Sequence, residues 1–192
     1  MTATDLVAAL TPVVEALETL DVPYYLAGSI ASSAHGIARA SLDADVVADV
    51  QARHVDGLAR CLTGAYYIPL DTMRLAVSEQ RSFNLIHLTT MFKIDVFVQK
   101  GRPYDRVAAA RAQRQVIDGL SESPRFLVAS AEDTVLAKLE WFRLGGETSE
   151  RQWWDIVGVL RVAATDRSYL HRWALALGVA DLLDRALEQA TE

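Results

Sequence analysis

The fold is decided by the stretch Leu42-Asp43-Ala44-Asp45-Val46-Val47-Ala48, in which two acids alternate with apolar residues inside a short hydrophobic run. Successive side chains of a β-strand point to opposite faces, so the alternation predicts a strand with Asp43 and Asp45 on one face. A charged side chain taken out of water is costly unless it is paired or coordinated. Two carboxylates that project toward one point therefore indicate a cation site.

A later hydrophobic run, Phe92–Val98, carries Asp95 as its only acid and also predicts a core strand. Upstream, an apolar run that ends at Gly28-Ser29 predicts a buried strand, followed by a helix over residues 30–38. The glycine permits close approach to a ligand, and Ser29 at the helix N-cap leaves amide groups for a phosphate. Taken singly, each acid also fits a strand end in solvent or a salt bridge, and the Gly-Ser pair fits a plain turn. The three acids together favour a bound cation, expected to be magnesium.

The order of these features resembles the nucleotidyltransferase superfamily, whose members share the DNA polymerase beta-like fold: a Gly-Ser turn, an acid-x-acid strand and a third acid on a later strand. Two longer stretches resemble one subgroup, the AbiEii-type bacterial nucleotidyltransferases. The first is His35 to Arg39 followed by Ser41 to Asp43, and the second is Ala131 to Leu139 with Arg151 to Asp155. The resemblance covers most of the chain.

This resemblance implies an α+β fold with an α/β-type nucleotidyltransferase core, in which a small mixed sheet is flanked by helices and followed by a helical C-terminal subdomain. It implies a metal-dependent transfer of a nucleoside monophosphate from a nucleoside triphosphate to an acceptor hydroxyl, with pyrophosphate leaving. Asp43, Asp45 and Asp95 are then the catalytic residues and the ligands of Mg²⁺, with Mn²⁺ as the alternative ion. The implied nucleotide-binding residues are Gly28, Ser29, Arg39, Lys138 and Arg151.

The pattern of apolar residues changes after residue 130, which predicts a nucleotidyltransferase core over residues 1–130 and a helical C-terminal subdomain over residues 131–192 packed on it. The core is expected to contain helices over residues 5–20, 30–38, 52–62 and 102–111. Its expected strands cover residues 22–29, 42–48, 65–70, 83–89, 92–99, 113–117 and 126–128. The subdomain is expected to contain helices over residues 132–144, 149–162, 168–177 and 180–190.

The formal net charge is −6 and the isoelectric point is near 5.2, which argues against extended, sequence-blind binding of nucleic acid. The cations are nevertheless unevenly spread. One group fits either a basic patch beside the acids or a solvated helix face, and it consists of Lys93, Lys100, Arg102, Arg106, Arg111, Arg114 and Arg125. The acceptor therefore stays open between RNA, protein and a small molecule.

The subdomain offers Lys138, Arg143 and Arg151 as candidate contacts to the triphosphate, although each equally fits a helix-surface cation paired with a nearby acid. Most tryptophans of this region are expected in the core. Trp153 and Trp154 are adjacent on a helix and cannot both face inward, so one of them is a candidate for the wall of a cleft.

No run reaches the ~18 apolar residues of a membrane helix, and the first residues lack the pattern of a signal peptide. We therefore expect no membrane partner and a cytoplasmic location. Cys61, the only cysteine, lies between Leu58 and Leu62 on an expected helix and is predicted to be a core thiol. The histidines show no metal-ligand spacing, and His35 is singled out because its helix starts at the Gly-Ser turn.

Two alternatives belong to other functional classes. In the first, the chain binds a nucleotide without turnover, and the presence of all three acids argues against this. In the second, which the AbiEii resemblance allows, the chain is the toxin-type component of a toxin–antitoxin pair and depends on an antitoxin partner.

Overall fold

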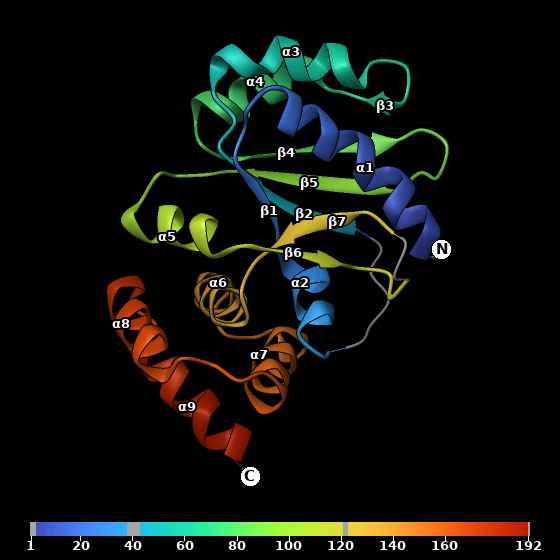
Figure 1. Ribbon diagram of the computed structural model, residues 1–192. Coiled ribbons are helices and arrows are strands. Elements are labelled where there is room, and N and C mark those ends of the chain that lie inside the picture. Colours follow the sequence, from blue (N-terminus) through green and yellow to red (C-terminus); the bar gives the residue numbers. More distant parts are fainter. Residues whose placement is uncertain (1–2, 38–42, 121–122, 192) are drawn as a thin grey trace.

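One mixed β-sheet with helices on both faces makes up the described part of the chain, residues 3–37, 43–120 and 123–191 of the computed structural model (Figure 1). The strands are β1 (Tyr24–Leu26), β2 (Asp43–Ala48), β3 (Tyr66–Tyr67), β4 (Ser82–His87), β5 (Lys93–Val98), β6 (Gln113–Val116) and β7 (Arg125–Val128). The helices are α1 (Ala3–Thr19), α2 (Gly28–Ala34), α3 (Ala52–Leu62), α4 (Leu70–Ser78), α5 (Pro103–Arg111), α6 (Ala131–Leu144), α7 (Glu150–Val162), α8 (Arg167–Leu177) and α9 (Ala180–Thr191). The expected fold class, a mixed sheet flanked by helices with a helical C-terminal part, is confirmed. Among the described helices, none is long and apolar enough to span a membrane.

The sheet has the strand order β3-β4-β5-β2-β1-β7-β6, with β2 at its centre. β2 runs parallel to β5 and antiparallel to β1, and β1 runs parallel to β7. β2 and β5 pair along their whole length, which places Asp45 directly beside Asp95. Every second residue of both strands is buried, so the predicted alternation is present and the acids lie on the less buried face.

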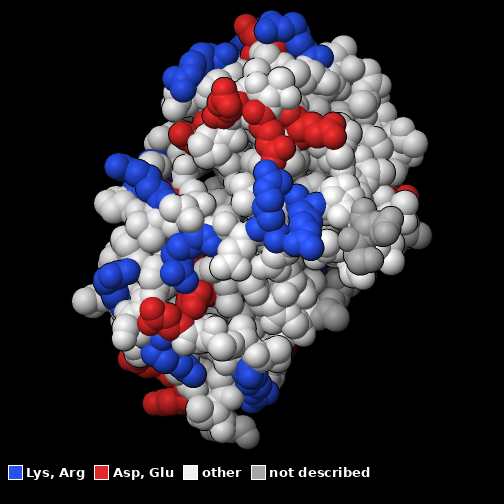
Figure 2. Space-filling view, in the orientation of Figure 1, with Lys and Arg blue, Asp and Glu red and all other residues white. Residues whose placement is uncertain are grey.

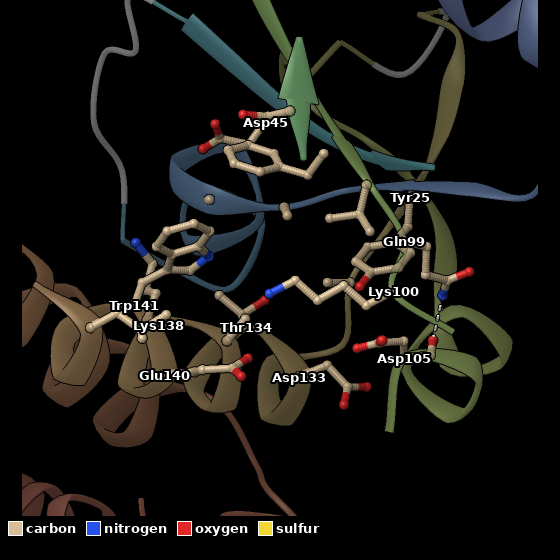
Figure 3. A pocket seen from close by; sticks show the side chains of 18 of the residues that line it. Tyr25, Asp45, Gln99, Lys100, Asp105, Asp133, Thr134, Lys138, Glu140 and Trp141 are labelled. Carbon is tan, nitrogen blue, oxygen red and sulfur yellow. Dashed lines mark hydrogen bonds between the residues drawn. The ribbon is translucent and has the colours of Figure 1, made fainter. Parts of the chain in front are cut away.

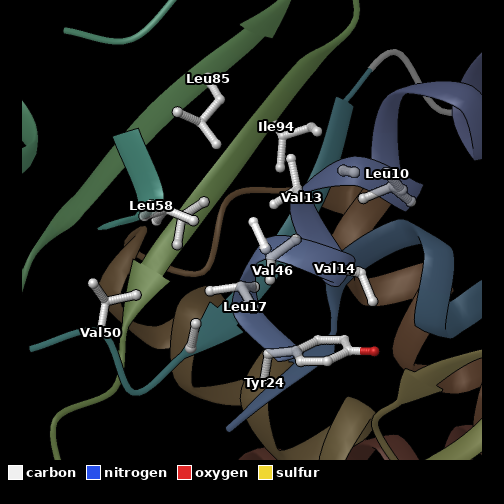
Figure 4. Packing of buried hydrophobic residues seen from close by; sticks show 14 of the residues in the cluster. Leu10, Val13, Val14, Leu17, Tyr24, Val46, Val50, Leu58, Leu85 and Ile94 are labelled. Carbon is white, nitrogen blue, oxygen red and sulfur yellow. The ribbon is translucent and has the colours of Figure 1, made fainter. Parts of the chain in front are cut away.

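The other face of the sheet packs against α1, α3 and α4 and forms the larger apolar core (Figure 4). Val13 and Leu17 of α1 belong to this cluster together with Val46 of β2 and Ile94 of β5, and all four are fully buried. Burying a side chain of this size stabilises the fold by about 1.5–3 kcal/mol. The positions of β2 and β5 are therefore fixed from the side opposite the acids.

A second apolar cluster joins the C-terminal helices α6 to α9. Its members begin at residue 131, apart from Tyr104 and Ala108 of α5, which pack with it although they precede it in the chain. In Figure 1, α6 lies below the sheet, on the side away from α3 and α4. The acid-bearing face of β2 and β5 is therefore turned toward the C-terminal helices rather than toward the larger core.

The region after α3 differs from the prediction. The strand expected over residues 65–70 is only the short β3, and α4, which the sequence pattern does not reveal, begins at Leu70. Pro69 explains the boundary, because a proline has no amide hydrogen to donate within a sheet and here takes the N-cap position of the helix.

Cys61 is exposed, so the prediction of a core thiol is wrong. The buried stripe of α3 contains Val55, Leu58 and Leu62. Adjacent residues of an α-helix are rotated by about 100° relative to each other, so the residue before Leu62 turns away from the stripe. The prediction considered only that Cys61 lies on a helix next to buried leucines, and not which side of the helix it faces.

Candidate active site

Three acids lie together on the sheet face that is turned away from α1. Asp43 and Asp45 project from β2, and Asp95 projects from β5 beside Asp45. The side chain of Asp43 is 44% exposed and that of Asp95 is 18% exposed, so the group meets solvent rather than lying in the core. The expectation that the acids share one face is confirmed, and their role as metal ligands stays a prediction.

The surroundings of Asp45 disfavour its charged form. Its pKa is raised from 3.8 to about 6, first because burial disfavours the charged form and then because Asp43 and Asp95 repel it. Lys138 and Lys93 act in the opposite direction and lower this pKa. The acids therefore create an excess of negative charge that a cation would relieve.

Lys93 brings a positive charge into the acid group from the protein itself. It precedes Asp95 by two residues on β5 and so shares its face. Its ammonium nitrogen lies 2.7 Å from Oδ2 of Asp95 and 4.0 Å from Oδ2 of Asp43. The hydrogen bond to Asp95 is the main cause that raises the pKa of Lys93. The sequence pattern assigns Lys93 to a candidate basic patch and does not predict this contact. The two-residue spacing between Lys93 and Asp95 nevertheless indicates that both side chains lie on the same face of the strand.

The donors of the acid group fit a hard divalent cation. Carboxylate oxygens are the ligands that Mg²⁺ and Mn²⁺ prefer, and the raised pKa of Asp45 shows that added positive charge is favourable here. Asp43 and Asp45 would hold the ion, and Asp95 would complete the set. Among the described residues, however, no three His, Cys, Asp or Glu side chains are already grouped to hold a metal ion. Asp95 is instead engaged by Lys93.

Gly28 lets the turn after β1 pass against Asp45. Its φ of +58° lies in the left-handed region, and a Cβ built on it would lie 1.7 Å from Oδ2 of Asp45. The amide of the preceding residue, Ala27, donates a 2.8 Å hydrogen bond to the carbonyl oxygen of Asp45. The position therefore requires glycine both for its backbone angle and for the space that the carboxylate occupies.

Ser29 is not the helix cap that the sequence predicts. α2 already begins at Gly28, and Ala27 takes the N-cap position without a side-chain hydrogen bond to the helix. The positive φ of Gly28 turns the chain into the helix before Ser29 is reached. Ser29 is buried, and together with Gly28 it lines a cleft that Asp43 and Asp45 also line. Both predicted nucleotide-binding positions of this turn thus lie at the candidate site.

A cleft of about 800 Å³ opens in front of Asp43 and Asp45, between the sheet and α6, and Asp95 is not among its lining residues (Figure 3). Asp43 and Asp45 line it from the sheet, and Lys138 and Trp141 line it from α6. Small-molecule sites usually measure about 300–1,000 Å³, so the volume suits a ligand of nucleotide size. Further polar groups along the cleft are Tyr25, Gln99, Lys100, Asp105, Asp133, Thr134 and Glu140.

Of the three predicted nucleotide-binding cations, two line the cleft, and they differ in burial. Lys138 is buried in the cleft wall, with its ammonium nitrogen 2.8 Å from Oδ2 of Asp155. This confirms the pairing with an acid, but the pair needs only one of the three N–H donors of the ammonium group. Arg151 lines the same cleft and is exposed. Arg39 lies outside the described residues.

Much of the expected basic patch is paired within the protein. The ion pairs are Arg102 with Asp105 and Glu140, Arg111 with Glu132 and Asp133, and Arg114 with Glu18. Arg143, a candidate triphosphate contact outside this patch, is likewise paired with Glu147 and Asp181. On the face shown in Figure 2, Lys and Arg are interspersed with Asp and Glu. These pairs favour a structural role for the arginines over contact with the phosphates of RNA.

Trp141 is a cleft residue where the sequence pattern predicts a core residue. It is 52% exposed, and its ring stands edge-on to Phe97 with the ring centroids 5.7 Å apart. It projects from α6 toward the acid-bearing strands in Figure 3. The three-residue spacing from Lys138 signals that both lie on one side of the helix. Trp153 and Trp154, the expected candidates for a cleft wall, lie outside this cleft.

His35, singled out by its place after the Gly-Ser turn, anchors the end of α2. Its Nε2 lies 2.7 Å from the carbonyl oxygen of Ala129, just before α6 begins. A carbonyl only accepts hydrogen bonds, so the ring nitrogen donates. This contact indicates a structural role, because it ties α2 to the connection between the sheet and the C-terminal helices.

Solved structures of similar fold are found at low sequence identity. The chain is similar to an antigenic nucleotidyltransferase-like protein from Paracoccidioides brasiliensis, with 17% identity, a TM-score of 0.54, and coverage of 98% of this chain and 94% of that chain. It is also similar to a proposed nucleotidyltransferase from Thermotoga maritima, with 13% identity, a TM-score of 0.50, and coverage of 80% and 94%. The fold is that of the nucleotidyltransferases. The antibiotic-resistance factor ANT(2'')-Ia shares this nucleotidyltransferase fold, with 13% identity, a TM-score of 0.58, and coverage of 96% and 98%. No protein-family model matches the sequence, and no curated protein does either.

Proposed function

We propose that this protein is a metal-dependent nucleotidyltransferase that transfers a nucleoside monophosphate from a nucleoside triphosphate to an acceptor hydroxyl. The observation that carries the proposal is the acid group, in which Asp45 and Asp95 stand side by side on parallel strands and Asp43 shares their face. Asp43 and Asp45 of this group line a cleft of nucleotide size. The fold likeness supports the reaction class.

The residues of the acid group take distinct roles in this proposal. Asp43 and Asp45 would hold the divalent ion, with Asp95 completing the set, and the ion would supply charge neutralisation for the triphosphate. Asp95 orients the acceptor hydroxyl and takes its proton, while the acceptor oxygen forms a bond to the α-phosphorus. The bond between that phosphorus and its bridging oxygen breaks, and pyrophosphate leaves with the electron pair.

The helical wall of the cleft supplies binding groups for the nucleotide. In this proposal Lys138 and Arg151, which both line the cleft, contact the phosphates, and Lys138 does so with the N–H donors that its pair with Asp155 leaves over. Trp141 offers an exposed aromatic face on which a base can stack. Positioning and charge neutralisation then supply most of the rate enhancement.

A small molecule with hydroxyl groups fits as the acceptor better than RNA does. Arg102, Arg111 and Arg114 are held by acids of the protein, and the chain carries a net charge of −6. An RNA strand would need several free cations along its path. One protein of similar fold is an antibiotic-resistance factor, which is in line with a small acceptor.

The test is incubation with each nucleoside triphosphate, labelled at the α-phosphate, together with Mg²⁺. Total RNA, cell protein and a pool of small metabolites and antibiotics are supplied in separate reactions. We expect label in the small-molecule reaction, dependent on Mg²⁺ and lost in Asp45→Asn. Bound nucleotide without label transfer in any reaction would reject the transferase and favour binding alone.

That second candidate, nucleotide binding without turnover, is favoured by one observation: Lys93 already engages Asp95, the proposed acceptor-side acid. The AbiEii-type identity, and with it a toxin-type function and an antitoxin partner, is supported by the sequence stretches 35–43 and 131–155 alone. Co-expression with the product of a neighbouring gene, followed by affinity capture of this chain, tests for such a partner. A cytoplasmic location remains part of the proposal.

A further inference from the structure

We propose that Lys93 is an internal counter-cation of the acid group, which holds Asp95 when no divalent ion is bound and thereby sets the affinity of the site for that ion. This inference rests on the proposed function, because it requires a divalent-ion site at the three acids. Lys93 is a positioning residue in this scheme, since it acts through Asp95 rather than on the substrate.

The strand register brings Lys93 to this place. On paired strands β2 and β5, Lys93 lies directly beside Asp43, and Asp95 follows it two residues later beside Asp45. All four side chains therefore project from the same face. The ammonium nitrogen reaches Oδ2 of Asp95 at 2.7 Å and stands 4.0 Å from Oδ2 of Asp43. It thus lies between two of the proposed metal ligands.

A divalent ion and this ammonium group compete for the same carboxylate. An ion held by Asp43 and Asp45, with Asp95 completing the set, would share two of these carboxylates with the Lys93 ammonium group, and like charges brought so close repel. The Lys93 side chain is 44% exposed, so it has room to swing into solvent. Ion binding therefore includes the loss of the Lys93–Asp95 pair, and the apparent affinity is lowered by the strength of that pair.

The three acids share a face, yet among the described residues no three metal-ligating side chains are already grouped to hold an ion. Asp45 has a raised pKa, caused by burial and by its two acidic neighbours, and Lys93 counteracts part of that rise. Lys93 thus limits the repulsion that the strands would otherwise carry without a bound ion. A partly exposed ion pair of this kind changes the dissociation constant of a competing ion by about fivefold.

Calorimetric titration of the nucleotide-free protein with Mn²⁺ tests the inference. We expect Lys93→Met to lower the dissociation constant for Mn²⁺ by about fivefold. Lys93→Arg keeps the cation and the pair, so it should stay near the wild-type value. Lys100→Met is the matched control, because Lys100 lines the same cleft but forms no salt bridge within the described part of the chain. Its removal should change the constant by less than about twofold, because in the described part of the chain Lys100 forms no ion pair with the three acids.

Thermal unfolding in EDTA gives a second readout that does not depend on ion binding. Lys93→Met should lower the midpoint of unfolding relative to wild type, because the acids lose their internal counter-cation. Added Mn²⁺ should then raise the midpoint of Lys93→Met by more than that of wild type. If Lys93→Met does not fold, Lys93→Gln, which also removes the charge, takes its place with the same expectations.

The outcomes separate this inference from the proposed function. Equal or weaker Mn²⁺ binding by Lys93→Met overturns the role of Lys93, whereas label transfer by the wild type would still support the transferase. Tighter binding by Lys93→Met, with no label transfer by the wild type, supports the counter-cation and rejects the catalytic proposal. Absence of Mn²⁺ binding in every variant overturns both the ion site and the role of Lys93.

Discussion

The two faces of strands β2 and β5 are made by neighbouring residues, yet they follow opposite physical rules. Val46 and Ile94 point into the larger apolar core and are fully buried, whereas Asp45 and Asp95 point toward the C-terminal helices. Burial lowers the free energy of the first pair, whereas it disfavours the charged form of Asp45 and so raises the pKa of this carboxyl group. One strand can therefore carry stability on one side and chemistry on the other.

The sharpest form of this comparison uses two adjacent residues. Ile94→Ala should lower the free energy of unfolding by about 3 kcal/mol, because it leaves a cavity in the core. Asp95→Asn should leave stability almost unchanged but reduce nucleotidyl transfer by at least about 100-fold. Urea unfolding and the label-transfer assay measure the two effects. A loss of stability in Asp95→Asn as large as that in Ile94→Ala would mean that the acid face stabilises the fold as much as the apolar face does.

Gly28 extends the comparison to the turn that approaches the acid face. Gly28→Ala should lower the free energy of unfolding by about 2 kcal/mol and abolish transfer, because the new Cβ collides with Oδ2 of Asp45 and the backbone has a positive φ. The matched control is Gly178→Ala, since Gly178 has a φ of +70° and nothing within 4 Å of an added Cβ. Gly178→Ala should lower the free energy of unfolding by about 1 kcal/mol through backbone strain alone and leave nucleotidyl transfer unchanged. Equal transfer in both variants would show that the contact with Asp45 is unimportant.

The acid face could be predicted from sequence because its signal is local. A period of two residues is enough to put Asp43 and Asp45 on one side of a strand, and it does not depend on the strand's neighbours. The same period puts Lys93 on the face of Asp95, but its contact with Asp43 depends on the register between β2 and β5. Register is a property of the folded sheet, so this contact was missed.

Contacts across long sequence separations were also out of reach. Arg102 pairs with Glu140, which lies 38 residues later, and the sequence offered no means to choose that partner over solvent or RNA. Trp141 looked like a core residue by composition, whereas its exposure depends on where α6 meets the sheet. Composition and periodicity predicted the elements well, but the pairing of surface cations and the lining of the cleft follow from tertiary packing.

α6 repeats the two-faced pattern and gives the next prediction. Leu139 is fully buried in the second cluster, whereas Trp141, two residues on, faces the cleft. Trp141→Ala should weaken binding of a nucleoside triphosphate about tenfold through loss of base stacking, with little effect on stability. Trp154→Ala is the control, because Trp154 is similarly exposed but lies outside the cleft. Titration calorimetry measures both, and equal affinities would place the base elsewhere.

The smallest expected effect concerns Asp45 itself, and it tests whether the acid face is electrostatically strained without a bound ion. The pKa of Asp45 in the folded protein is about 6 rather than 3.8, so between these values the folded chain holds a proton that the unfolded chain releases. The stability that this proton provides is complete below about pH 4 and is lost as the pH rises through about 6. Asparagine is nearly isosteric with aspartate and neutral at every pH. In EDTA, the free energy of unfolding of Asp45→Asn should therefore exceed that of the wild type by about 1 kcal/mol near neutral pH and by almost nothing near pH 4. Urea unfolding of both proteins at the two pH values gives the difference directly, with the other titrating groups cancelling. A less stable Asp45→Asn near neutral pH would identify Asp45 as a hydrogen-bonded structural acid, and the acid face would then differ from the apolar face in composition but not in strain.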